Sequence, residues 1–193
     1  AAAARRGVGA ARLGVMGRAV HPEAAALIAH FGMVPLPAEG TLFVSTYRSP
    51  TEFADGSPHG TAIIAMYSDD PPSQSLFHRL PVDEVWHFYG GDPLRLVLLH
   101  PDRSSEDVIM GANPLAGEHV QVVVPAGSWQ AGHLVAGGRY ALFGCTMAPG
   151  FTGAMYEGGE RDVLRRRYPD RADDIERLGC AAQEVRMPEG FAP

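Results

Sequence analysis

The chain contains no lysine, so arginine supplies all 16 of its basic side chains. Without a lysine amine, a Schiff base cannot form on this sequence, which excludes the enzyme classes that depend on one. Its two cysteines, Cys145 and Cys180, are too few for a disulfide framework or a cysteine zinc site. No apolar run approaches the roughly 18 residues that a membrane span needs, so we expect no membrane partner.

The charge balance is acidic, with a formal net charge of −6. Binding to nucleic acid needs a basic face, so we expect no nucleic-acid partner. The densest basic run, 165–167, has Asp162 and Asp170 close by in the sequence and is interpreted as a solvated helix face with local ion pairs. With few cysteines and no membrane span, we expect a cytoplasmic protein.

The composition divides the chain into two parts. Residues 1–20 are rich in alanine, glycine and arginine and lack a clear apolar core, so we predict a disordered tail or an extension there. Residues 21–193 have the mixed composition and the length of one domain.

Alternating apolar residues and frequent turn residues predict a mostly β domain. A helix is predicted over residues 22–31, ended by Gly32, and helical spacing returns over 161–167 and 172–178. Strands are predicted at 41–46, 61–67, 76–80, 85–89, 94–99, 119–124, 128–134 and 140–147. Short strands at this regular spacing favour a single-domain jelly-roll barrel with a short N-terminal helix and C-terminal helices.

Residues 75–94 concentrate the groups that carry chemistry. His78, Glu84 and His87 lie within this short stretch, and imidazole and carboxylate groups can hold a divalent metal or move protons. Because side chains alternate along a strand, Trp86 shares the inward face with Glu84, whereas His87 is predicted to lie on the opposite face.

Five phrases in this chain resemble, in the same order, those of a known superfamily. They are residues 45–49, 77–79, 83–94, 123–130 and 144–151. The chain resembles a cupin, and more narrowly a small cupin family of largely unassigned function, over about residues 22 to 180. The resemblance implies the cupin jelly-roll barrel with a pocket inside it.

The ligand set departs from the pattern of three His and one Glu that a full cupin metal site shows. The first motif retains only one His, because either Leu76 or Leu80 occupies the position of the other. In the second motif, Gln130 stands where the His is expected. The resemblance therefore implies that His78, Glu84 and Gln130 hold one divalent transition metal at most, or that the site requires no cofactor.

Metal-free acid–base chemistry is the other possibility for this pocket. A His beside a carboxylate in a dry barrel can shuttle a proton near neutral pH. Cupin-fold sugar epimerases of the dTDP-4-dehydrorhamnose 3,5-epimerase type work with His and Tyr and without a metal. By this resemblance His78 would be the base, Glu84 its orienting partner and Tyr140 a possible acid.

Substrate contacts are expected from aromatic and polar side chains. Trp86 and Phe88 would wall a pocket for a planar or cyclic ligand, although ordinary core packing explains them equally well. Arg48 and Arg79 could clamp a carboxylate or a phosphate, or form surface salt bridges. The predicted substrate-binding residues are Tyr47, Arg48, Phe77, Trp86, Phe88 and Gln130.

Two functions follow as hypotheses. The first is an enzyme that isomerises, epimerises, cyclises or eliminates a small organic molecule by proton transfer. The second is a non-catalytic cupin that binds a small molecule and retains a degraded metal site. In either case we expect a homodimer, because pairing through an edge strand hides the sheet edge.

Overall fold

The computed structural model describes residues 19–182 and 185–192. The prediction for residues 1–20 therefore lies almost entirely outside the described residues. No helix in the described ranges is long and apolar enough to cross a membrane.

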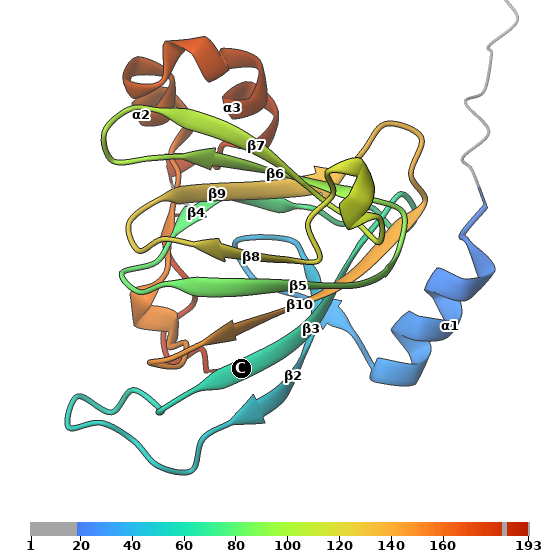
Figure 1. The fold of residues 1–193 in the computed structure, drawn as a ribbon. Coiled ribbons are helices and arrows are strands. Elements are labelled where there is room, and N and C mark those ends of the chain that lie inside the picture. Colours follow the sequence, from blue (N-terminus) through green and yellow to red (C-terminus); the bar gives the residue numbers. More distant parts are fainter. Residues whose placement is uncertain (1–18, 183–184, 193) are drawn as a thin grey trace, which may run out of the picture.

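Two antiparallel sheets face each other and form the body of the protein (Figure 1). The six-stranded sheet consists, in spatial order, of β1 (Val34–Pro35), β2 (Leu42–Arg48), β3 (Thr61–Ser68), β10 (Tyr140–Met147), β5 (Glu84–Gly91) and β8 (Gln121–Val124). The five-stranded sheet consists of β11 (Glu157–Gly158), β4 (Ser75–Arg79), β9 (Trp129–Leu134), β6 (Leu94–Leu99) and β7 (Ser105–Met110). Strands that are distant in sequence pair side by side, as in β3 with β10, which gives the predicted jelly roll.

The main core fills the space between the two sheets. It combines aromatic side chains of the six-stranded sheet with aliphatic side chains of β6 and β7. Trp86 and Phe143 stack with ring centroids 4.8 Å apart, and both are at least 98% buried. Side chains that alternate along the strands point into this core, as the period-two pattern in the sequence predicts.

Helices cover the outer faces of the sheets. Helix α1 (Pro22–Phe31) packs against residues of β2, β3 and β10, and Gly32 ends it in the left-handed conformation at φ 63°. Helices α2 (Arg161–Arg167) and α3 (Ala172–Leu178) cover β4, β6 and β9 with their apolar side chains. Short 3₁₀ helices lie in the connections, among them η1 (Pro114–Ala116), η2 (Gly153–Met155) and η3 (Pro169–Arg171).

The prediction of a mostly β jelly roll with one N-terminal and two C-terminal helices is confirmed. The eight predicted strands are present as β2–β6 and β8–β10, with ends that move by a few residues. The apolar alternation did not predict β7, which begins with the polar residues Ser105, Glu106 and Asp107 at the edge of its sheet. It also missed the two-residue strands β1 and β11.

Candidate functional site

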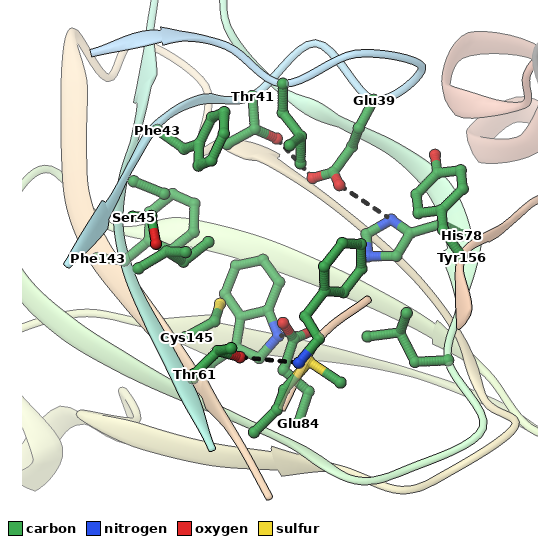
Figure 2. A pocket seen from close by; sticks show the side chains of 17 residues that line it. Glu39, Thr41, Phe43, Ser45, Thr61, His78, Glu84, Phe143, Cys145 and Tyr156 are labelled. Carbon is green, nitrogen blue, oxygen red and sulfur yellow. Dashed lines mark hydrogen bonds and ion pairs between the residues drawn. The ribbon is translucent and has the colours of Figure 1, made fainter. Parts of the chain in front are cut away.

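A narrow cavity lies inside the barrel, against the inner face of the six-stranded sheet (Figure 2). The cavity volume is about 50 Å³, which leaves room for a few water molecules or one very small organic molecule. Strands β2, β3, β5 and β10 supply mostly apolar walls, and β4 contributes His78 from the opposite sheet. The polar side chains that reach the cavity include Glu39, Glu84 and Cys145.

An irregularity in β4 directs His78 into the cavity. The pairing of β4 with β9 shifts register between Ser75 and His78, so both side chains point inward although they are three residues apart. Phe77 lies between them and packs in the opposite direction, under α2 and α3. A bulge of this kind re-aims a side chain that regular alternation would turn away.

The imidazole of His78 is held in one orientation. Its Nδ1 lies 2.9 Å from the carbonyl oxygen of Leu76, and a carbonyl oxygen can only accept, so Nδ1 carries the hydrogen in this contact. The ring stacks on Tyr156 with centroids 5.3 Å apart. In the neutral ring Nε2 is therefore an acceptor, and Figure 2 shows it directed into the cavity.

Glu39 is the carboxylate beside His78, and it was not among the site residues predicted from the sequence. Its Oε2 lies 3.8 Å from His78 Nδ1, and the residue is only 8% exposed. Oε1 accepts hydrogen bonds from the hydroxyls of Thr41 at 2.6 Å and Ser75 at 2.7 Å. Ser75 also contacts the hydroxyl of Tyr67 at 2.5 Å, so a buried network fixes this carboxylate.

The loop before β2 explains why Glu39 was missed. Glu39 lies between two residues with positive φ, Ala38 at 61° and Gly40 at 91°. These turns bring the loop back over the barrel, where the Leu36 amide donates to the Thr41 carbonyl and the Gly40 amide to the Leu36 carbonyl. The available signal was a Glu followed by a Gly just before a predicted strand.

Glu84 lies in the cavity wall as predicted, but its side chain forms hydrogen bonds with residues other than His78. Its Oε2 accepts hydrogen bonds from Gln130 Nε2 at 2.7 Å and from Trp86 Nε1 at 3.1 Å. Burial raises the pKa of Glu84, and the nearby His78 and the two hydrogen bonds offset that effect only in part. The carboxyl is therefore poised to hold a proton at a higher pH than an ordinary Glu.

The thiol of Cys145 faces the same cavity. Burial and the charges of Glu84 and Glu39 raise the pKa of this thiol well above its usual range. A thiol in this state remains protonated near neutral pH, so Cys145 is a weak nucleophile. It contributes a soft, neutral wall beside Glu84.

Tyr140, the predicted acid, lies outside the cavity. It is the first residue of β10, and the residues of this strand that line the cavity are Phe143, Cys145 and Met147. Tyr140 packs instead with α1 and its neighbours, with its ring 5.1 Å from that of His21. Desolvation and the carboxylate of Glu23 raise the pKa of Tyr140 to about 12.

The predicted substrate-binding residues are divided between the cavity and other places. Trp86 lines the cavity, and Phe88 packs against the main core near it. Gln130 is buried behind Glu84, where its amide oxygen accepts from Trp86 Nε1 at 3.0 Å. Phe77, as described, lies under the C-terminal helices, and Tyr47 is 53% exposed.

The arginines and His87 also lie away from the cavity lining. Arg79 forms a bidentate pair with Glu157, both contacts at 2.9 Å. Arg48 donates to the Phe151 carbonyl at 3.4 Å and pairs with Glu52 at 3.3 Å. His87 contacts Thr146 and Gln121 and is absent from the cavity lining, in agreement with the predicted opposite face.

The cavity residues do not fit a cupin metal centre. Over residues 19–182 and 185–192, no three His, Cys, Asp or Glu side chains are placed to hold one metal ion together. Of the predicted ligands, Gln130 is engaged with Glu84 and Trp86. Leu80, one of the two residues predicted to stand in the position of the missing His, forms part of the apolar wall. One imidazole and separated carboxylates make a poor ligand set for a transition metal.

Comparison with known proteins agrees with this architecture. The family model described as cupin superfamily (DUF985) matches residues 25–158. The fold is similar to that of a hypothetical protein from Leishmania major, at 27% identity and a TM-score of 0.72, covering 81% of this chain and 98% of that one. It is also similar to a protein from Shewanella oneidensis, at 28% identity and a TM-score of 0.74, covering 82% and 98%.

A comparison with curated proteins gave no significant match. The family match nevertheless covers most of the chain, including β2 to β5, β10 and the residues His78 and Glu84. The two solved structures are similar over 81% and 82% of this chain. The chain therefore belongs to the cupin superfamily, in the family described as DUF985.

Proposed function

We propose that this cupin is an enzyme that transfers a proton on a small organic molecule held in the cavity, with His78 as the base. The observation that carries the proposal is the orientation of the imidazole. The Nδ1 hydrogen is donated to the Leu76 carbonyl, so the lone pair of Nε2 faces the cavity. A base must present such a lone pair within reach of the proton that it removes.

The two buried carboxyl groups suit complementary roles. When Nε2 takes a proton, the ring becomes a cation, and Glu39 at 3.8 Å from Nδ1 stabilises it. Glu84 has a raised pKa and can supply a proton to an oxygen of the bound molecule. In this proposal Glu84 replaces Tyr140 as the acid, and Glu39 replaces Glu84 as the partner of His78.

The simplest balanced reaction is the exchange of a carbon-bound proton next to a carbonyl. Nε2 of His78 takes the proton from carbon while Glu84 gives its proton to the carbonyl oxygen, which forms an enol. When His78 returns its proton to the opposite face of the same carbon and the enol O–H gives its proton back to Glu84, the carbonyl is regenerated and the product is an epimer. Where that carbon carries a hydroxyl, His78 can instead protonate the former carbonyl carbon while this hydroxyl gives its proton to Glu84, which forms the isomeric carbonyl compound. The apolar walls from Phe43, Trp86 and Phe143 exclude water, which strengthens both electrostatic interactions.

The test is solvent exchange on small neutral ketones. Wild-type protein in D₂O is mixed with hydroxyacetone or dihydroxyacetone, and loss of the signals of the protons next to the carbonyl is followed by NMR. The wild type should accelerate the loss, and His78→Gln should slow it by about 10²–10⁴-fold. His87→Gln is the matched control, because His87 lies on the outer face of the same barrel and should keep the wild-type rate.

A wild-type rate no greater than that of His78→Gln would refute the proposal. One observation favours the second hypothesis, a binding protein without catalysis. Each carboxyl already receives two hydrogen bonds from the protein, so the cavity is stable without a reacting partner. Saturable binding of a ketone without any exchange would establish that alternative.

A further inference from the structure

The charge of the cavity restricts what can bind there. Of the residues that the structure describes, seventeen line it, and they include Glu39 and Glu84 but no arginine. The chain also has no lysine. His78 is therefore the one side chain in this lining that can become a cation, and it lies 3.8 Å from the Glu39 carboxylate. The Glu39 carboxylate therefore offsets any positive charge on His78 even when no ligand is bound.

The arginines that the sequence suggested as anion clamps have other partners. Arg79 is paired with Glu157 and lies over the ring of Trp129, with its guanidinium carbon 4.5 Å from the ring centroid. Arg48 pairs with Glu52 and with a backbone carbonyl. Neither side chain lines the cavity.

An anion that enters the cavity would therefore lose its hydration without contacting a cationic side chain that lacks a partner. A carboxylate or phosphate in the cavity would also lie among two buried carboxyl groups, and burying a charge without a partner is strongly unfavourable. A neutral molecule avoids this penalty, and a cation gains attraction from the Glu39 carboxylate. The aromatic walls accept either, since a ring face is also attractive to a cation.

We propose that the ligand of this cavity is a small molecule of zero or positive charge, and that the Glu39 carboxylate excludes anions. The inference depends on the proposed function only in taking this cavity as the place where the substrate binds. It removes keto acids and phosphorylated sugars from the candidate substrates. It leaves small neutral carbonyl compounds and amines.

The experiment uses three molecules of nearly equal shape that differ in charge: acetamidinium, acetamide and acetate. The chain has two tryptophans, and their indole N–H signals report on binding by NMR. Trp86 Nε1 donates to Glu84 and Gln130 at the cavity wall, whereas Trp129 lies under α2 and α3. Trp129 is therefore an internal reference, and a Trp86→Phe variant assigns the two signals.

At constant ionic strength near neutral pH, acetamidinium and acetamide should shift the Trp86 signal saturably and leave the Trp129 signal in place. Acetate should bind at least about tenfold more weakly than acetamide. Glu39→Gln should reduce that difference, because it removes the carboxylate that offsets the charge of His78 and repels anions. Glu176→Gln, which alters an exposed carboxylate on α3, should leave it unchanged.

Acetate that binds as tightly as acetamide would overturn the inference, and so would the failure of all three molecules to shift the Trp86 signal. The proposed function fails separately. His78→Gln should abolish exchange on ketones while acetamide still binds more tightly than acetate. Loss of that order in the wild type would reject the ligand class even if exchange were observed.

Discussion

Replacing Ser75 by alanine should destabilise the protein far more than the loss of one small hydroxyl suggests. Ser75 is fully buried, and its oxygen contacts Glu39 at 2.7 Å, Tyr67 at 2.5 Å and Thr41 at 2.8 Å. The hydrogen bond to the carboxylate contributes about 1.5–3 kcal/mol, and leaving the buried Tyr67 hydroxyl without its partner costs about 1–3 kcal/mol. We therefore expect a loss of about 3–5 kcal/mol, which is a large part of the roughly 5–15 kcal/mol that holds a domain folded.

Urea unfolding of the wild type and Ser75→Ala measures this loss. Ser45→Ala is the matched control, because Ser45 lines the same cavity but is exposed, and it should change stability by less than about 0.5 kcal/mol. In the double variant Ser75→Ala/Tyr67→Phe, the Tyr67 hydroxyl that Ser75→Ala leaves without a hydrogen-bond partner is also removed. The double variant should therefore be about 1–3 kcal/mol more stable than the sum of the single effects predicts. Additive effects, or a loss below about 1 kcal/mol for Ser75→Ala, would refute the buried network as described.

Three further outcomes are expected. Burial raises the pKa of Glu84 above its unfolded value, so its favourable contribution is present below the unfolded pKa and is lost as pH rises through the folded pKa. The stability of the wild type relative to Glu84→Gln should thus decline with rising pH. The decline should be about 1.4 kcal/mol for each pH unit by which the folded pKa of Glu84 exceeds its unfolded pKa. A stability difference between the two proteins that stays constant with pH in urea unfolding would contradict this. Phe143→Ala should lose about 3–5 kcal/mol in thermal or urea unfolding, because the ring is 1% exposed and stacks on Trp86. Tyr140→Phe should retain the wild-type rate of hydrogen exchange on ketones, since Tyr140 packs against α1. A large fall in that rate would show that Tyr140 takes part in catalysis.

The sequence predicted the fold well where local signals are strong. Pro22 and Gly32 mark the ends of α1, because proline fits the first turn of a helix and glycine readily adopts the left-handed conformation that ends it. Strand β7 escaped because its first three residues are polar, and a strand at a sheet edge needs no regular apolar alternation. The expected homodimer stays a prediction.

The candidate site was only half predictable, for reasons of geometry. His78, Glu84 and Trp86 follow from the motif and do line the cavity. Glu39 reaches His78 from a loop with two positive-φ residues, and no periodic pattern reports such a contact. Tyr140 was misplaced because β10 is apolar on both faces: one faces the core and the other is covered by α1, so the sequence alone does not show which side points inward.

The central claim is that His78 presents an unprotonated Nε2 to the cavity. Nitrogen-15 NMR of the imidazole rings tests it directly, because the shifts of Nδ1 and Nε2 reveal which nitrogen carries the hydrogen in the neutral ring. A His78→Gln variant assigns the signal among the eight histidines of the chain. The account predicts that in the neutral form of the ring the hydrogen is on Nδ1, donated to the Leu76 carbonyl. A neutral ring with the hydrogen on Nε2 would contradict it, because the cavity would then contain a donor instead of a base.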